Sequence, residues 1–293
     1  MTPSCIQRRG ARPAVTWFVL LCWGFVCLPC ASAKLTVVYP LSETLDERQQ
    51  YPLKVLALAL QKAGVDYSLR PSERVMAQSR ALSQLSVGGD VTVVWTMTSI
   101  EREKTFLPIR IPLEKGLLGW RIFLIHQKNA SKFAVIKTLD DLKTYEAGQG
   151  HDWPDTEILR FNGLKVQGSS NFDGIFKMLE SGRIDYFPRS MLEVWAEIRN
   201  HPDMNLQVEE TIILQYPTAQ YFFVNKDNTV LAHLIESGLR IALKDGSFDK
   251  LFSEEYGNAI KRVNLKSRMH FRIANPLLPR ETPLQDQRLW FND

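Results

Sequence analysis

Reactive side chains are sparse in this 293-residue sequence, and few stand at spacings that support catalysis or metal binding. The segment 151–155 (HDWPD) is the nearest approach to a metal-ligand group. However, the five histidines are scattered, with neither an i,i+4 pair nor an HExxH motif. Ser42 and Ser190 lack a nucleophile elbow. Residues 88–89 (GG) precede an expected strand, whereas a phosphate-binding loop opens a helix. These patterns disfavour hydrolases and metalloenzymes, and we expect no cofactor.

The segment 148–155 (GQGHDWPD) also groups side chains that could contact a small ligand: His151, Asp152 and Trp153. Asp152 is equally suited to cap a helix that begins near Pro154. Trp153 could stack on a sugar, an aromatic ring or a heterocycle, or it could simply pack half-buried. The same choice applies to the other large aromatic residues, for each of which core packing is the commoner role: Tyr39, Trp95 and Trp120.

The first third of the body predicts alternating strands and helices. Short β-branched runs bounded by Pro or Gly indicate buried strands, and runs of helix formers ended by Gly indicate helices. Strand, helix, strand, helix, strand is the pattern of a parallel α/β sheet. The expected elements are strands at 34–39, 67–70 and 91–95 and helices at 53–63 and 72–85, followed by an irregular, proline-rich segment at 106–112.

Further strands and helices are expected beyond residue 116, together with an extended tail. The tail, 275–293, contains three prolines, and we expect Trp290 and Phe291 to pin it to the body. The expected strands are 117–125, 166–167, 182–187 (with a turn) and 220–224; 145–150 is short and Gly-rich; and the expected helices are 138–142, 153–161, 171–181, 192–199, 229–245 and 248–256.

Residues 1–33 are typical of a cleavable secretory signal peptide. Arg8, Arg9 and Arg12 precede an apolar run from Ala14 to Leu28, and residues 31–33 (ASA) offer a small-x-small cleavage site. The alternative is a membrane anchor, but the run falls short of the roughly 20 residues that a spanning helix needs. We therefore expect a periplasmic protein that begins at residue 34.

Removal of this segment changes the composition of the body. It takes away three arginines and no acid, so the formal net charge falls from +4 to +1. A nearly neutral body gives little reason to expect nucleic-acid binding. The secreted part is also expected to lack disulfides, because every cysteine lies in the removed segment: Cys5, Cys22, Cys27 and Cys30. At 260 residues it is long enough to rely on its hydrophobic core.

Several stretches occur in the order found in family-3 periplasmic solute-binding proteins, the class that binds polar amino acids. Segment 89–98 (GDVTVVWTMT) resembles the family's strand and loop ending in Met-Thr, and 99–104 (SIEREK) resembles its T-P-E-R-x-K motif. Segment 172–187 resembles the helix followed by L-x-x-G-R-V-D-A. Segment 223–256 resembles the closing helices around Asp-Gly and is the most specific of these matches.

The resemblance implies a two-lobed type II periplasmic-binding-protein fold of the α/β class, with a hinge and a ligand cleft between the lobes. Lobe 1 would comprise 34–116 and 219–293, including a C-terminal tail at 262–293. Lobe 2 would comprise 117–218. The tail could brace lobe 1 or cover the hinge.

The resemblance also suggests ligand contacts in lobe 1. In the family, the arginine at the position of Arg102 grips the ligand carboxylate with a two-pronged hydrogen bond. The alternative for Arg102 is a solvated or ion-paired residue at a helix start. The neighbouring loop would supply hydroxyl and backbone N–H groups from Thr96, Thr98 and Ser99, with Trp95 beside them.

In lobe 2 the sequence departs from the amino-acid-binding pattern. The aspartate that holds the ligand ammonium in the family is replaced by Ser190, and Arg189 precedes it. Arg189 is expected to repel an ammonium group, which argues against an ordinary amino acid as ligand. Residues 148–155 occupy the place of the family's anion-binding loop, with His151, Asp152 and Trp153 where it has Ser or Thr.

These observations favour a monomeric protein that captures a small polar, carboxylated solute. Its partner would be an inner-membrane ABC permease or a membrane sensor. One alternative is an enzyme, since a few relatives are periplasmic dehydratases; Glu43, Asp152 or Glu193 would then act as general acid–base. Another alternative is an adaptor that binds no ligand.

Overall fold

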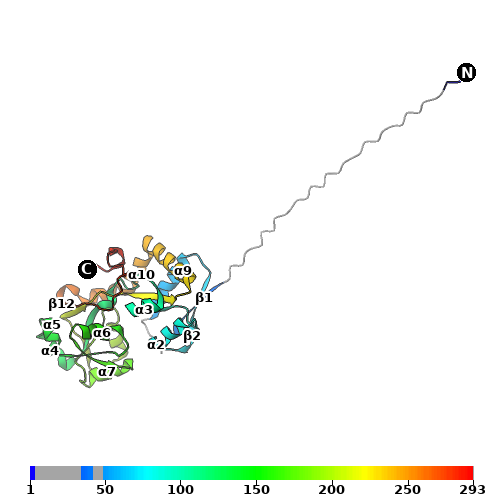
Figure 1. Ribbon diagram of the computed structural model, residues 1–293. Coiled ribbons are helices and arrows are strands. Elements are labelled where there is room, and N and C mark those ends of the chain that lie inside the picture. The colour runs from blue at the N-terminus through cyan, green and yellow to red at the C-terminus, as the bar shows by residue number, and fades with distance from the viewer. Residues whose placement is uncertain (4–33, 42–48, 293) are drawn as a thin grey trace. The chain divides into compact units, whose positions relative to one another are not determined.

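The computed structural model describes residues 1–3, 34–41 and 49–292, and residues 34–293 form one compact unit. The signal-peptide prediction and Glu43 lie outside the described residues. No helix in the described part of the chain combines the length and hydropathy needed to cross a membrane. The compact unit is a mixed α/β structure with three hydrogen-bonded sheets, shown in Figure 1.

The first sheet pairs β1 (Leu35–Leu41) with β2 (Tyr67–Val75) in parallel. The chain reaches β2 through α1 (Gln50–Lys62), whose buried face repeats at helical spacing with Val55, Leu56, Ala59 and Leu60. On the other side of β1, the backbone N–H groups of Thr92 and Val93 donate to the Val38 carbonyl. The third strand expected in this parallel sheet instead becomes β3 of the second sheet, where it pairs antiparallel with β11.

The second sheet is antiparallel, with the order β3 (Val94–Met97), β11 (Gln220–Asn225) and β4 (Phe106–Ile109). β4 corrects the expectation of an irregular segment at 106–112. Pro108 is tolerated because β4 pairs with β11 alone, and a strand at the edge of a sheet can lack one donor. The buried side chains of Phe222 and Phe223 show that β11 is the centre of this sheet.

The third sheet has the order β12–β10–β5–β8–β6–β7, with β9 also paired to β5. β5 is antiparallel to β8, β9 and β10, whereas β6 is parallel to β7 and β8. Residues 122–125 of β5 are all buried, as expected for a central strand. The strands are β5 (Trp120–His126), β6 (Glu146–Gly150), β7 (Lys165–Ser169), β8 (Tyr186–Ser190), β9 (Leu206–Val208), β10 (Ile212–Gln215) and β12 (Met269–Arg272).

Helices pack around these sheets. In Figure 1, the helices α4, α5, α6 and α7 gather beside the third sheet, while α2, α3 and α9 lie near the first two. The bounds are α2 (Gln78–Ser86), α3 (Ile100–Thr105), α4 (Ala130–Ala134), α5 (Leu139–Leu142), α6 (Pro154–Phe161), α7 (Phe172–Glu180), α8 (Val194–Asn200), α9 (Thr229–Lys244) and α10 (Ser247–Val263).

Two of the sequence-based expectations need correction in extent. The helix expected at 72–85 is a strand at its start, because β2 runs to Val75 and α2 begins at Gln78. The last helix is longer than expected, because α10 continues to Val263. Neither β9, β10 nor β12 was expected from the sequence.

Two short segments connect the second and third sheets directly and lie side by side, and we call them the crossing segments. The first is residues 110–119 and the second is residues 216–219. They are joined where Tyr216 N–H donates to the Gly119 carbonyl, and nearby Leu113 N–H donates to the carbonyl of Gln220 at the start of β11. A Cβ at Gly119 would lie 2.1 Å from the Tyr216 carbonyl oxygen, so glycine is required for this close approach. The chain reaches the third sheet once more through α9 and α10, which lead from β11 to β12.

The C-terminal tail contacts both crossing segments. The Trp290 ring covers Gly116, the Phe291 N–H donates to the Lys115 carbonyl, and the Asn275 side chain donates to the Pro217 carbonyl. The prediction that the aromatic residues pin the tail is confirmed. The lobe boundaries stay predictions. The tail, assigned by them to lobe 1, contributes β12 to the third sheet.

A pair of glycine variants tests the packing of α1 on α9. At Gly238 in α9, a Cβ would lie 1.8 Å from the Ala59 backbone oxygen. We expect Gly238→Ala to destabilise the protein by about 1–3 kcal/mol, because the helices must move apart. Gly257 in α10 has open space around it, so Gly257→Ala should stabilise by about 0.5–1 kcal/mol through helix propensity. Chemical denaturation of both variants measures the change in the free energy of unfolding. Equal changes in the two variants would contradict the close packing of α9 on α1 at Gly238.

Candidate ligand-binding cleft

A cleft of about 1400 Å³ lies beside the crossing segments, and its lining includes residues from all three sheets. Trp95, Thr96 and Arg102 line it on the side of the second sheet. Residues 151–155 and Arg189 line it on the side of the third sheet. Glu114 of the first crossing segment lines it as well. Strand ends from two separate sheets, and the starts of the helices that follow them, therefore meet at one cavity.

Among the described residues, the hydrogen-bond partners of the Arg102 guanidinium are all neutral. Arg102 lies in the first turn of α3, where the Ser99 hydroxyl caps the helix by accepting from the Arg102 backbone N–H. Its guanidinium donates to the Thr96 hydroxyl (2.9 Å), the Met97 carbonyl (2.7 Å) and the Gln78 side chain (2.8 Å). Burial lowers the pKa of Arg102 to about 10, although the charges of Asp155 and Asp152 oppose this. Arg102 is therefore a cation at neutral pH.

Arg189, at the end of β8, is buried and ion-paired. Its Nε lies 2.9 and 2.8 Å from the two carboxylate oxygens of Glu197, and its Nη2 lies 2.5 Å from Glu197 Oε1. The guanidinium also lies 4.9 Å from the centre of the Phe187 ring and 5.2 Å from that of Trp153. Burial would lower the pKa of Arg189, but Glu193 and Glu197 together raise it.

A second buried pair joins β5 to the start of α6. Arg121 Nη2 lies 2.5 Å from Asp155 Oδ1, and Arg121 Nε donates to the Tyr216 hydroxyl at 2.8 Å. Tyr216 donates in turn to Asp155, which closes a three-membered network. Burial, and then the neighbouring carboxylate, raise the pKa of Tyr216 well above its ordinary value. Tyr216 is therefore a neutral hydrogen-bond donor.

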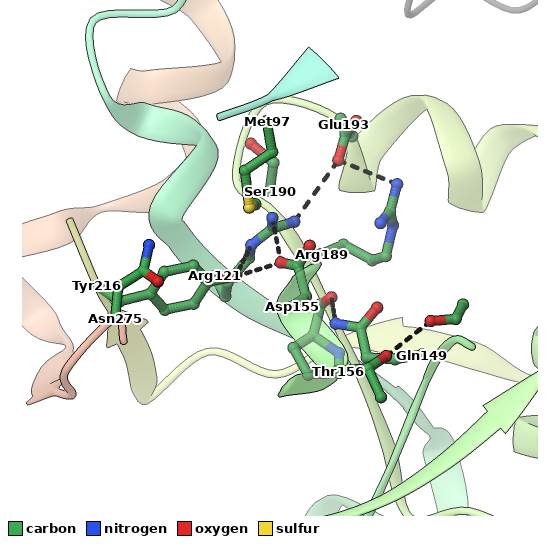
Figure 2. A network of polar contacts seen from close by, with 12 residues as sticks. Met97, Arg121, Gln149, Asp155, Thr156, Arg189, Ser190, Glu193, Tyr216 and Asn275 are labelled. Carbon is green, nitrogen blue, oxygen red and sulfur yellow. Dashed lines mark hydrogen bonds and ion pairs between the residues drawn. The ribbon is translucent and has the colours of Figure 1, made fainter. Parts of the chain in front are cut away.

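Glu193 connects these two buried pairs. Its Oε2 lies 3.0 Å from Arg189 Nη2 and 4.0 Å from Arg121 Nη1, and Figure 2 shows it between the two guanidinium groups. We call Arg121, Asp155, Arg189, Glu193 and Glu197 the charged cluster. It contains two cations and three carboxylates, so its formal charge is −1. All five of its residues line the cleft, as Arg102 does.

Glu114 adds a buried carboxyl group from the first crossing segment. The residue is 6% exposed, its Oε1 accepts from Tyr256 at a long 3.4 Å, and its Oε2 has no hydrogen-bond partner among the described residues. Desolvation first, and then the nearby charge of Glu193, raise the pKa of Glu114 to about 8, despite Arg121 and Tyr256. Glu114 is thus mainly protonated at neutral pH.

Comparison with solved structures identifies the fold. An ancestral arginine-binding protein bound to arginine matches with a TM-score of 0.56 at 21% identity, over 76% of this chain and 98% of that one. A probable amino-acid ABC transporter extracellular-binding protein from Bacillus subtilis matches with a TM-score of 0.58 at 18% identity, over 76% of this chain and 98% of that one. A histidine kinase sensor domain with similarity to periplasmic binding proteins matches with a TM-score of 0.57 at 17% identity, over 77% of this chain and 96% of that one.

The chain has the two-lobed type II periplasmic-binding-protein fold. No family model and no curated protein sequence matches it. Below, the side of the second sheet is called lobe 1 and the side of the third sheet lobe 2.

The structure brings seven of the predicted site residues to the cleft lining of this binding fold: Trp95, Thr96, Arg102, His151, Asp152, Trp153 and Arg189. Asp152 does not cap α6, because Trp153 occupies the N-cap position and Pro154 follows it. The Trp153 ring lies against Gly150 and stacks 6.4 Å from Phe187, so one of its faces packs within lobe 2. His151 and Asp152 are exposed.

The other three predicted site residues are outside this lining. Thr98 is buried and donates to Glu103, and Ser99 caps α3. The Ser190 hydroxyl is fully buried, where it donates to the Leu117 carbonyl and accepts from the Leu192 N–H. Arg189 is also unlike the expectation: because Glu197 neutralises it, its charge is not free to repel an ammonium group.

Four cleft residues were not assigned to ligand binding from the sequence: Glu114, Arg121, Asp155 and Glu197. One signal was available, since Arg121 interrupts the apolar run of β5 and a buried arginine needs a carboxylate partner. The partner could not be read from spacing, because Asp155 is 34 positions away in another element. Within the described residues, no group of three His, Cys, Asp or Glu side chains is arranged to hold a metal.

Proposed function

We propose that the protein is a periplasmic solute-binding protein that captures a small polar, carboxylated ligand in the cleft between its lobes. The loaded protein would deliver this ligand to an ABC importer or present it to a membrane sensor. Proteins of both kinds occur among the structures with the same fold. The signal-peptide pattern of residues 1–33 supports export to the periplasm.

The observation that carries this proposal is the state of Arg102. A guanidinium has five N–H donors, and the described residues accept three hydrogen bonds from it. No described carboxylate lies within ion-pair distance of Arg102, unlike Arg121 and Arg189. A partly buried cation with spare donors on a cleft wall favours a carboxylate, which can accept two parallel hydrogen bonds.

The size of the cleft supports closure around a ligand. Its 1400 Å³ exceeds the roughly 300–1000 Å³ of typical small-molecule sites. The two adjacent crossing segments are the natural hinge between the lobes, because a few residues there can absorb the backbone rotation. Small-angle scattering should therefore show the radius of gyration contracting slightly when ligand binds.

The test is to identify what the protein carries. The mature protein is purified from periplasm and mildly denatured, and the released small molecules are identified by mass spectrometry. We expect a carboxylated solute that rebinds to refolded protein and is recovered unchanged. Recovery of a chemically altered compound would favour the enzyme alternative. If nothing co-purifies and no small molecule from a broad carboxylate panel binds, the proposed function is wrong.

A further inference from the structure

The C-terminal tail passes from lobe 2 to lobe 1, and its first residues are bound to lobe 2. Its strand β12 belongs to the third sheet, and the Ile273 N–H continues that sheet by donating to the Gln215 carbonyl at 2.8 Å. The Asn162 side chain then donates to the Ala274 carbonyl (2.8 Å) and accepts from the Ala274 N–H (3.1 Å). Because Asn162 ends α6, the tail is fixed to lobe 2 as far as Ala274.

Three residues later the tail is bound to lobe 1. The Leu277 carbonyl accepts from the Ile100 N–H at 3.0 Å. Ile100 is the first residue of α3, and the N–H of a first helical residue has no acceptor within its own helix. Farther along the tail, Trp290 packs against the buried cluster of lobe 1 that includes Phe223 of β11. The tail thus caps the helix that carries Arg102 and then stays on lobe 1.

A tight turn at residues 275–278 joins these two attachments. The Asn275 carbonyl accepts from the Leu278 N–H, and the Asn275 side chain accepts from the Leu277 N–H at 2.9 Å. The same side chain, labelled in Figure 2, donates to the Pro217 carbonyl of the second crossing segment at 2.9 Å. A β-turn holds its end Cα atoms within about 7 Å, whereas four extended residues span about 10 Å. The connection therefore has little slack while the turn is formed.

The tail also holds the first crossing segment at two residues with left-handed backbone. Lys115 and Gly116 have φ values of 48° and 79°, and this region is uncommon for a residue with a side chain. The Phe291 N–H donates to the Lys115 carbonyl at 2.8 Å, and the Trp290 ring covers Gly116. Rotation of two lobes changes the backbone angles of the segments between them. Such rotation must therefore break these tail contacts or carry the tail with it.

We infer that residues 274–278 form a strap that limits rotation of the lobes about the crossing segments. Two crossing segments alone would allow the lobes to rotate as a hinge. The strap is a further short connection, bonded at both ends. Rotation that separates Ala274 from Leu277 must first melt the turn or pull the Leu277 carbonyl away from Ile100. The second event uncaps α3, so the strap also links lobe rotation to the helix that carries Arg102.

The test measures the distance between the lobes in protein without ligand. Because all four cysteines lie in residues 1–33, the mature protein expected to begin at residue 34 has none of its own. Ser79→Cys on α2 and Lys177→Cys on α7 place one exposed label site on each lobe at the cleft. Nitroxide labels at both sites report the distribution of distances by double electron–electron resonance. We expect Asn275→Ala to broaden this distribution and to add a population several ångström from the original.

Arg288→Ala is the matched control, because Arg288 is an exposed tail residue that pairs with Asp286 of the tail at 2.8 Å. It should leave the distance distribution unchanged. Asn275→Asp is a milder second variant, since it keeps the acceptor for the Leu277 N–H but loses the donor to the Pro217 carbonyl. It should broaden the distribution less than Asn275→Ala does. Circular dichroism confirms that each variant is folded.

Hydrogen exchange at the Ile100 amide gives a second readout of the same variants. This amide should exchange severalfold faster in Asn275→Ala and at the original rate in Arg288→Ala. An unchanged distance distribution in folded Asn275→Ala would overturn the strap, as would equal broadening in Arg288→Ala. Neither readout involves a ligand, so the strap can fail while the proposed function stands, and the reverse also holds.

Discussion

Replacing Arg102 by alanine is expected to weaken ligand binding by about tenfold to a hundredfold. A hydrogen bond to a charged group contributes about 1.5–3 kcal/mol, and each 1.4 kcal/mol is a factor of ten in affinity. The loss grows if the ligand carboxylate is left buried without a cationic partner. Arg102→Lys should recover only part of the affinity, because an ammonium cannot form two parallel hydrogen bonds with a carboxylate. Titration calorimetry with the co-purified ligand measures these effects.

Lys104→Ala is the matched control for Arg102→Ala. Lys104 lies on the same short helix, and its exposed side chain pairs with Glu101 outside the cleft lining. This variant removes the same charge and should leave affinity within twofold of the original. Thermal unfolding of both variants checks that Arg102→Ala retains its fold after losing three hydrogen bonds. Unaltered ligand affinity in a folded Arg102→Ala protein would show that the carboxylate binds elsewhere.

The core elements of the fold could be predicted because their signals are local. Apolar β-branched runs give β1 and β5, and helix formers ended by glycine give α1 and α9. The strands that could not be predicted pair with partners that are distant in the sequence. β4 contains a proline and is stable only because β11 pairs with it, and β12 is formed only because β10 offers a free edge. No periodicity within four residues could indicate such pairing.

The candidate site was predictable to a similar degree. The position of Arg102 and the segment 151–153 followed from motif order, and both line the cleft. The charged cluster did not follow, because its members come from β5, β8 and the starts of α6 and α8. Ser190 shows the same limit: motif order placed it among the ligand contacts, but at the end of β8 its hydroxyl is hydrogen-bonded to the backbone of Leu117 and Leu192.

Replacing Arg189 by methionine is expected to produce the largest loss of stability, about 3–5 kcal/mol. The guanidinium and the Glu197 carboxylate are each almost fully buried, at 3% and 6% exposure. Removing the cation leaves Glu197 desolvated without its partner, which is the costly way to break a buried pair. At about 2–4 °C per kcal/mol for a chain of this size, the melting temperature should fall by roughly 10 °C.

The chain offers a control of the same geometry in a different environment. Arg240 and Glu236 on α9 also approach to 2.5 Å, but their side chains are 65% and 41% exposed. Solvent screens an exposed pair, so Arg240→Met should cost less than about 1 kcal/mol. The double variant Arg189→Met with Glu197→Leu should be more stable than Arg189→Met alone, because the buried Glu197 charge is then no longer left without a partner. If Arg189→Met costs no more than Arg240→Met, the pair is not buried in solution, and Arg189 would be free to meet a ligand.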